Sequence, residues 1–232
     1  MSLLDNLKTD SSIKEDGDRL GGFTPLDTDL YDLKIDLAFL TVSAGEATAL
    51  NVHASTADGK TVRQVFWMTS GKAKGCKNFF IDKKGDKQYL PGFNQANALC
   101  LLTIGKEISK ATTDHKVINL FDPKEMKEVP TKVEMITELI GKKVLAGVIK
   151  QNVDKRAKDP QAGEYKPAGE TRMENESDKF FRASDGRTVA EIRAQQKTAE
   201  FKIKWLDKWS GQIKDKTTQV SGVASGAPGM PA

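Results

Sequence analysis

The segment DLYDLKIDLAFLTVS, residues 29–43, has the clearest structural pattern in the sequence. From Tyr31 to Phe39 an apolar side chain stands at every second position, and Asp, Lys or Ala fills the positions between. A period of two places one row of side chains in a core and the other row in water, which is typical of a half-buried strand. We therefore predict a β-strand over these residues.

The two segments that follow also have the pattern of strands. EATALNVHAST, residues 46–56, is followed by Asp58-Gly59, a dipeptide that favours tight hairpin turns, and then by KTVRQVFWMTS, residues 60–70. Together with the first stretch they predict a three-stranded antiparallel meander. The Lys- and Gly-rich segment that continues to Lys87 is interpreted as a long mobile connection.

After Pro91-Gly92 the sequence predicts a helix of about three turns, with Asn94 as its N-cap and Gly105 as its stop. The chain then returns to strand patterns. Strands are predicted at residues 115–123, 128–135, 142–153 and 171–182, a short helical link at 135–141, and a turn or loop at 155–169.

The C-terminal part changes character at Thr188, which forms a capping box with Glu191. Apolar residues then recur at spacings of three and four, which predicts one long helix that ends near Ser210. A second stripe on this helix either packs on the domain itself or holds a partner protein; it consists of Phe201, Trp205 and Trp209.

This order of elements predicts a fold that is mainly β with helices. The expected architecture is an OB-fold-like five-stranded barrel, with the first helix between strands three and four, an inserted β segment and a long C-terminal helix. The predicted organisation is a flexible acidic arm, the OB-fold-like domain, the C-terminal helix and a disordered tail, at residues 1–28, 29–186, 187–211 and 212–232.

The formal net charge of the 232 residues is only +4, but the charge is unevenly distributed. Residues 1–36 carry four basic and nine acidic side chains, a net −5. Residues 60–87 carry eight basic and two acidic ones, a net +6, and residues 142–158 carry six and one, a net +5. We expect the two basic blocks to meet at one surface of the barrel, where they would attract an anionic ligand.

Several classes of protein receive no support from the sequence. Cys76 and Cys100 are the only cysteines, and no Cys/His cluster accompanies them, so neither a disulfide scaffold nor a zinc site is predicted. No apolar run approaches the roughly 20 residues that span a bilayer, and the first ten residues lack the features of a signal peptide. We expect a cytosolic protein without a membrane partner.

The segment MTSGKAKGCKNFF, residues 68–80, resembles a phosphate-binding loop but departs from that motif. Gly71-Lys72 is followed by Ala73 where a Ser or Thr is required, and Phe66 stands where the first glycine belongs. The only imidazoles, of His53 and His115, have no recognisable catalytic partners. We therefore predict no cofactor and no enzymatic activity; a metal-dependent nuclease is the least favoured alternative.

Basic and aromatic residues alternate in the same region. Lysines precede Phe79 and Phe80, further lysines precede Tyr89, and Arg63 lies near Trp67. Single-stranded nucleic acid is bound by such mixtures, because cations track the phosphates and flat rings stack on unpaired bases, at about 1–3 kcal/mol per base. On composition alone, solvated loop lysines and core aromatics remain an equal alternative.

The sequence resembles the single-stranded DNA-binding proteins of tailed bacteriophages over roughly residues 29–205. The resemblance lies in YDLKIDLAFLTVSAGEATALNV, FWMTSGKAKGCKNFF, YLPGFNQANALCLLTIGKEI, TELIGKKVLAGVIKQNVDK and FFRASDGRTVAEI. It implies an OB-fold protein that coats DNA strands exposed in phage replication, recombination and repair, without sequence preference, in the cytoplasm of the infected bacterial host. It also implies self-association and replication partners such as a polymerase, helicase or primase.

The resemblance implies basic and aromatic DNA contacts. These fall on Arg63, Trp67, Lys72, Lys74, Lys77, Phe79, Phe80, Tyr89, Lys150 and Lys155. One feature departs from many such proteins: residues 217–232 carry no charged side chain, whereas an acidic tail commonly recruits partners. The acidic arm is the alternative competitor for the DNA site, and a non-enzymatic protein-interaction adaptor that uses the C-terminal helix is the alternative function.

Overall fold

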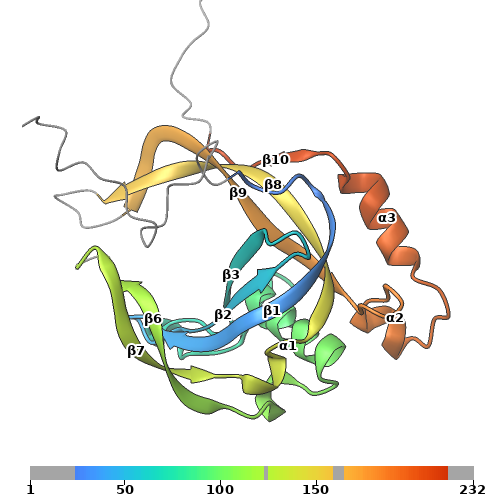
Figure 1. Ribbon diagram of the computed structural model, residues 1–232, viewed down its shortest axis with the longest axis horizontal. Coiled ribbons are helices and arrows are strands. Elements are labelled where there is room, and N and C mark those ends of the chain that lie inside the picture. Colours follow the sequence, from blue (N-terminus) through green and yellow to red (C-terminus); the bar gives the residue numbers. More distant parts are fainter. Residues whose placement is uncertain (1–23, 123–124, 159–164, 219–232) are drawn as a thin grey trace, which may run out of the picture.

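The computed structural model describes residues 24–122, 125–158 and 165–218, and within them the fold is mainly β with helices, as predicted (Figure 1). The predicted meander is confirmed: β1 (Asp29–Val42), β2 (Thr48–Ser55) and β3 (Thr61–Trp67) pair antiparallel in chain order. Gly59 has a φ of +83° in the turn between β2 and β3, a conformation that glycine adopts without strain.

A register shift between Ile35 and Leu37 divides the alternating pattern of β1 into two parts. Ile35, before the shift, lies in the main core, whereas Leu37 and Phe39, after it, pack in a second, smaller cluster on the other face. A β-bulge inserts one extra residue and so turns the following side chains to the opposite face of the sheet. The prediction of a single apolar row is therefore wrong, and β1 serves two cores.

The predicted long connection after β3 is folded into short elements. A 3₁₀ turn, η1 (Lys72–Lys74), leads into a hairpin of β4 (Phe79–Ile81) and β5 (Lys87–Tyr89). The Asp82 carboxylate accepts hydrogen bonds from the Lys84 and Asp86 amides and fixes the turn of this hairpin. These hydrogen bonds also lower the pKa of Asp82.

The first helix, α1 (Pro91–Thr103), begins at the predicted breaker and not after Asn94. Proline suits the first turn of a helix because its φ is already helical and its missing N–H would have no partner there. The N-cap residue is Leu90, whose side chain makes no capping hydrogen bond. The predicted stop is close to correct, since Gly105 has a φ of +69° just beyond the helix.

The later strands are present: the first two lie within one residue of their predicted bounds, and the last two are longer than predicted. They are β6 (Asp114–Asp122), β7 (Lys127–Met135), β8 (Lys143–Lys158) and β9 (Tyr165–Phe181), with η2 (Ile108–Lys110) before β6 and the link η3 (Thr137–Leu139) before β8. Antiparallel pairing of β8 with β9 continues out to Lys158 and Tyr165, so most of the predicted loop at 155–169 is strand. The hairpins β6–β7 and β8–β9 extend to the same side of the molecule (Figure 1).

The strands form one large sheet in the order β10-β8-β1-β2-β3, in which β10 is Ile213–Asp215. β9 lies beside β8, and β7 lies beside β1. Within the described residues no strand pairing joins β3 to β9, so the sheet is not closed. Instead the Ser177 amide on β9 donates to the side-chain oxygen of Gln64 on β3, at 2.9 Å. We call this junction the β3–β9 seam.

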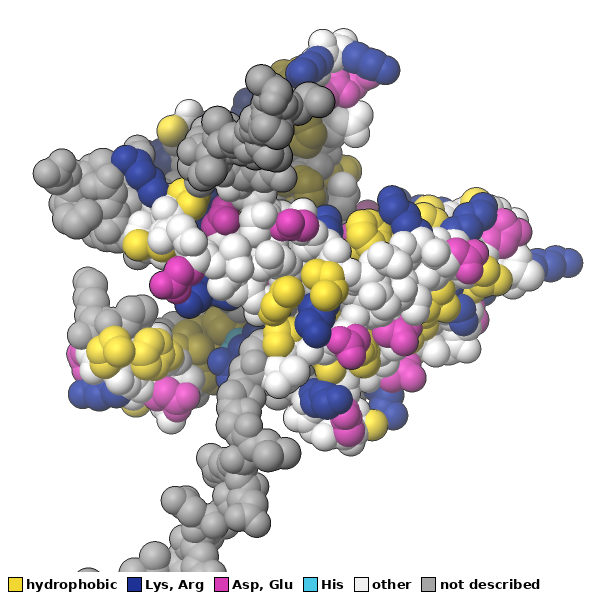
Figure 2. Space-filling model, turned by 90° about the horizontal axis from the view of Figure 1, so that it is seen from above, with side chains coloured by type: hydrophobic (Ala, Val, Ile, Leu, Met, Phe, Trp, Pro, Cys, Tyr) yellow, Lys and Arg dark blue, Asp and Glu magenta, His cyan; other side chains and the backbone are white. Residues whose placement is uncertain are grey.

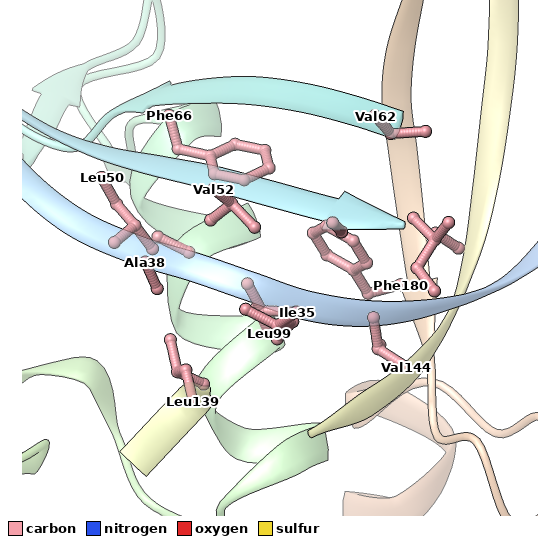
Figure 3. Close-up of a cluster of buried hydrophobic side chains, with 14 of the residues drawn as sticks. Ile35, Ala38, Leu50, Val52, Val62, Phe66, Leu99, Leu139, Val144 and Phe180 are labelled. Carbon is pink, nitrogen blue, oxygen red and sulfur yellow. The ribbon is translucent and has the colours of Figure 1, made fainter. Parts of the chain in front are cut away.

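The main core lies between the curved sheet and α1 (Figure 3). Leu50 and Phe66 contribute from the meander, Val144 and Phe180 from β8 and β9, and Leu99 from α1. Phe66 and Phe180 meet edge to face, with ring centroids 5.8 Å apart. Burial of such side chains stabilises the fold by about 1.5–3 kcal/mol each, and it holds β3 and β9 together where backbone strand pairing does not.

The predicted long C-terminal helix is wrong: two short helices, α2 (Val189–Arg193) and α3 (Glu200–Trp209), replace it. Gln195 adopts a φ of +55°, its amide donates to the Ile192 carbonyl, and the Gln196 amide donates to the Glu191 carbonyl. This is the Schellman arrangement that ends helices. The predicted capping box at Thr188 is confirmed.

A single carboxylate, that of Glu191, joins the two helices. One oxygen accepts from the Thr188 amide at 2.8 Å, and the other accepts from the Phe201 amide in the first turn of α3 at 2.7 Å. Burial of Glu191 opposes its ionisation, but these hydrogen bonds outweigh that effect and lower its pKa. Glu191 therefore fixes the orientation of α3 relative to α2.

Glu191→Gln is expected to lower the free energy of unfolding by about 1–2 kcal/mol, because an amide cannot accept at both ends. The pKa of Glu191 is lowered from 4.5 in the folded state, so its contribution is complete above pH 4.5 and is lost as the pH falls through the folded-state pKa. Urea unfolding at pH 7 and pH 3 measures both effects, with Glu200→Gln as the control. An equal loss of stability at both pH values would contradict the assignment.

The ends of the described chain are folded onto β8 and β9. Leu26 is buried, and the Asn175 side chain bonds both its amide and its carbonyl. The last residues of the predicted arm thus belong to the domain, whereas residues 1–23 lie outside the described part. Similarly, β10 (Ile213–Asp215), within the predicted tail, pairs parallel with β8, and residues 219–232 lie outside the description.

Candidate nucleic-acid interface

A surface groove of about 1040 Å³ runs beside the free edge of β3. Its walls are β3, the segment 69–77 with η1, strand β4, the first turn of α1 and the middle of β9. We call it the β3 groove. The Gln64 and Ser177 side chains of the β3–β9 seam lie at its boundary.

Five of the ten predicted contact residues line the β3 groove: Trp67, Lys74, Lys77, Phe79 and Phe80. Trp67 is 49% exposed and Phe80 is 45% exposed, although large aromatic side chains are normally buried. The fold therefore gathers basic and aromatic residues from three separate elements at one concave surface.

The Phe79 ring is flanked by two cations. The Lys77 ammonium lies 5.7 Å from the ring centroid and the Lys87 ammonium 5.1 Å from it, within the range of cation–π attraction. Tyr89 pairs with Phe79 across the hairpin and packs on Phe93, at 4.8 Å between ring centroids. Tyr89 does not line the groove, but it supports the strand that does.

The segment that carries these lysines is held against the turn between β1 and β2. The Lys72 ammonium forms an ion pair with Glu46 at 2.7 Å, and the Lys72 amide donates to the Gly45 carbonyl at 2.8 Å. A Cβ atom on Gly71 would lie 2.8 Å from that same carbonyl oxygen, so only glycine fits there. Lys72 therefore positions the segment, while Lys74 and Lys77 remain directed to the groove.

Arg63 lies at the far end of β3, beside a second cavity of about 560 Å³. This cavity shares Gln64 and Val65 with the β3 groove, so it continues the groove along the strand. Burial and the nearby Arg63 cation lower the pKa of His53, the cross-strand partner of Arg63. The surface next to Arg63 is thus uncharged on its β2 side at neutral pH.

The second basic block does not reach the β3 groove. Lys150 forms an ion pair with Asp27 at 2.9 Å, and Lys155 forms one with Glu170 at 2.7 Å. Neither residue lines a cavity next to Arg63 or Trp67. Lys155 lies on the extension of β8 and β9 into a long hairpin, and the expected meeting of the two basic blocks does not occur.

Sequence reasoning missed the wall that β9 and α1 supply. Gln95 on α1 donates a hydrogen bond to the Asp178 carbonyl, and both residues line the groove. The first turn of α1 also lines it, without a side-chain cap, so the positive end of the helix dipole lies at the groove. No local motif marks these residues, because tertiary packing alone brings them to β3.

Cations without an ion-pair partner lie at the groove, whereas the acidic side chains of its β9 wall have partners outside it. Among the described residues Lys74, Lys77 and Lys87 form no ion pair with a carboxylate. The acidic side chains of the β9 wall are engaged from outside: Asp178 accepts from the Trp205 indole N–H at 2.8 Å, and Glu176 pairs with Lys216 at 2.8 Å. Figure 2 shows that the upper face as a whole is a mixture of basic, acidic and hydrophobic side chains.

Within residues 24–122, 125–158 and 165–218 no three His, Cys, Asp or Glu side chains are grouped so as to hold a metal ion. None of the helices in these ranges is long and apolar enough to cross a membrane.

Comparison of the chain with protein-family models, with curated proteins and with solved structures finds no match.

Proposed function

We propose that this chain is a non-enzymatic, sequence-independent single-stranded DNA-binding protein of the tailed-bacteriophage family, acting in phage replication, recombination and repair in the host cytoplasm. The observation that carries the proposal is the β3 groove, in which Trp67, Phe79 and Phe80 lie beside Lys74 and Lys77. A groove with cations along it and rings at its walls meets both requirements for an unpaired strand.

The order of the barrel strands supports an OB-fold-like architecture. β1, β2, β3, β8 and β9 follow one another as the five strands of that fold do, and α1 precedes β8. Both β3 and β9 run parallel to β1, because each is separated from it by one strand in antiparallel pairing. The hairpins β4–β5 and β6–β7 are then insertions, and OB-folds use the second and third strands as a binding face.

The groove chemistry explains binding without sequence preference. Lys74 and Lys77 contact phosphates, which every nucleotide carries, and the rings of Trp67 and Phe80 accept the face of any base. The ammonium groups beside Phe79 hold a phosphate close to a stacked base. Replication proteins such as a polymerase, helicase or primase, and further copies of the chain, are the proposed protein partners.

The deciding experiment is the binding of fluorescent poly-dT over a range of salt concentrations. We expect log Kd to rise linearly with log salt, with a slope of about 0.7 for each phosphate neutralised. Equal or stronger binding to a duplex of the same length would refute the proposal. Absence of poly-dT binding, with a partner protein retained after nuclease treatment, would favour the adaptor; magnesium-stimulated DNA cleavage would favour the nuclease.

Replacing Lys74 and Lys77 together by alanine is expected to weaken poly-dT binding and to reduce its salt slope by about 1.4, the amount for two phosphate contacts. The control is the equally charged Lys142→Ala, Lys143→Ala variant, whose exposed residues lie at the start of β8, away from the groove. Salt titrations of both variants check the prediction. Identical slopes would remove the η1 segment from the interface.

A further inference from the structure

A second surface that combines cations with aromatic rings lies on the outer side of β9, along α3. The Lys179 ammonium on β9 stands 5.1 Å from the centroid of the Phe201 ring. At the other end of α3, Lys208 and Lys214 stand 4.9 Å and 5.6 Å from the ring of Trp209. We call this set, together with Lys204 between its two ends, the α3 surface.

The α3 surface is rigidly attached to the β-sheet. Trp205 is 3% exposed and packs against Ile149 and Phe181. A Cβ atom on Gly147 would lie 2.6 Å from the Trp205 ring, so the indole is in direct contact with the β8 backbone. Its N–H donates to Asp178, and the orientation of the helix is therefore fixed.

The groove and the α3 surface are continuous. A smaller cavity of about 300 Å³ lies between α1, α2 and β9, and it shares Pro91 and Gln95 with the β3 groove. Lys179, the first cation of the α3 surface, lines this smaller cavity. A strand that leaves the β3 groove past the start of α1 therefore meets Lys179 next.

The charge of this region is positive. Residues 197–216 carry six basic and three acidic side chains, a net +3. Among the described residues Lys179, Lys204 and Lys208 form no ion pair, and the nearby Glu176 is neutralised by Lys214 and Lys216. On the side where α3 lies, at the right in Figures 1 and 2, basic and hydrophobic side chains are interspersed with a few acidic ones.

We propose that the α3 surface binds a second segment of the same DNA strand that occupies the β3 groove. The phosphates of this segment contact Lys179, Lys204 and Lys208. Because α3 is about 15 Å long, these contacts extend along the DNA backbone and are not confined to one point. One lysine ammonium group already lies over the Phe201 ring and two lie over the Trp209 ring, so the contribution is electrostatic and not base stacking. This inference rests on the proposed function of the groove.

The test compares dT oligonucleotides of increasing length, bound to the full chain and to two triple variants. Lys179→Ala, Lys204→Ala, Lys208→Ala removes the α3 cations, and Lys132→Ala, Lys142→Ala, Lys143→Ala removes the same charge elsewhere. For the shortest oligonucleotides that bind, we expect all three proteins to have equal affinities and salt slopes. For long oligonucleotides, the α3 variant alone should show a salt slope smaller by about 2, the amount for three phosphate contacts. Its affinity should also stop rising at a shorter oligonucleotide length than the affinity of the unmodified chain.

The outcomes separate this inference from the proposed function. If the unmodified chain binds no oligonucleotide, the groove proposal fails and the α3 proposal fails with it. If short oligonucleotides bind and the α3 variant behaves like the control at every length, the α3 proposal alone is overturned. Unchanged DNA binding together with loss of binding to poly-glutamate would overturn it in favour of an acidic protein partner. The double variant Lys204→Ala, Lys208→Ala, which keeps the Lys179–Phe201 contact, repeats the test should the triple variant unfold.

Discussion

The variant Trp67→Ala, Phe80→Ala is expected to bind poly-dT at least about 30-fold more weakly than the unmodified chain. Both rings line the β3 groove from different elements and are about half exposed, so they are available to bases. Loss of a stacked base costs about 1–3 kcal/mol, and two such losses give the stated factor even at the lower limit. Fluorescence anisotropy at fixed salt measures the change, and the salt slope should stay the same because the phosphate contacts remain.

The matched control for that experiment is Val117→Ala, Phe121→Ala. These two side chains on β6 are also large, apolar and exposed, but they line no part of the β3 groove. Their removal should change the affinity less than twofold. Similar losses in the two variants would mean that the rings act through general surface hydrophobicity, and the groove would lose its role.

Gly92→Ala is expected to lower the free energy of unfolding by about 2 kcal/mol. Alanine is the better helix former by about 1 kcal/mol, so helix propensity alone predicts stabilisation. Packing decides the opposite sign, because a Cβ atom at this position would lie 2.1 Å from the Trp67 carbonyl oxygen. Backbone atoms at the end of β3 cannot move aside as a flexible side chain would, and overpacking at a rigid site typically costs 1–3 kcal/mol.

Urea unfolding of Gly92→Ala checks this prediction, with Gly45→Ala as the control glycine. The nearest atom to a Cβ on Gly45 is the Ser43 hydroxyl oxygen at 3.8 Å, an ordinary contact. Its replacement should change the free energy of unfolding by less than about 0.5 kcal/mol. A stable Gly92→Ala protein would mean that α1 can shift away from β3, and its DNA affinity would then show whether the groove depends on that contact.

The strands were predictable where their patterns are local. Alternation of apolar and polar residues identified β1, and the Asp58-Gly59 turn identified the following hairpin. The bulge between Ile35 and Leu37 was not predictable, because the alternation in the sequence continues through it. Only the presence of a second cluster, around Phe39, explains why the strand changes face there.

In the C-terminal region the predicted start of the helix is correct, but its predicted length is wrong. The capping box at Thr188 is present, and the apolar spacing to Leu206 is compatible with one helix. The chain breaks at Gln195 because the buried Glu191 carboxylate must also accept the Phe201 amide, which a continuous helix would use internally. A hydrogen bond between residues ten apart outweighs the periodicity.

The kinds of residue in the candidate site were predictable from the sequence, but the individual residues that form it were predictable only in part. Lys74, Lys77, Phe79 and Phe80 are close in sequence, so their clustering was evident before the fold was known. Lys150 and Lys155 were assigned to the same surface from their basic block, the expected barrel and the family resemblance. Their ion pairs with Asp27 and Glu170 occupy them elsewhere. The β9 wall of the groove depends on contacts between segments that are distant in the sequence, and sequence spacing does not predict such contacts.

The β3–β9 seam has a consequence for the time scale on which the protein exposes its backbone. In antiparallel pairing, every second residue of β3 donates its amide to β2. The amides between them face the seam, where the Gln64 side chain takes the place of a paired strand. Hydrogen exchange along β3 should therefore alternate between slow and fast from one residue to the next. A DNA strand in the adjoining groove covers the fast set, so ligand binding would be recorded as slowed exchange at every second amide of a single strand.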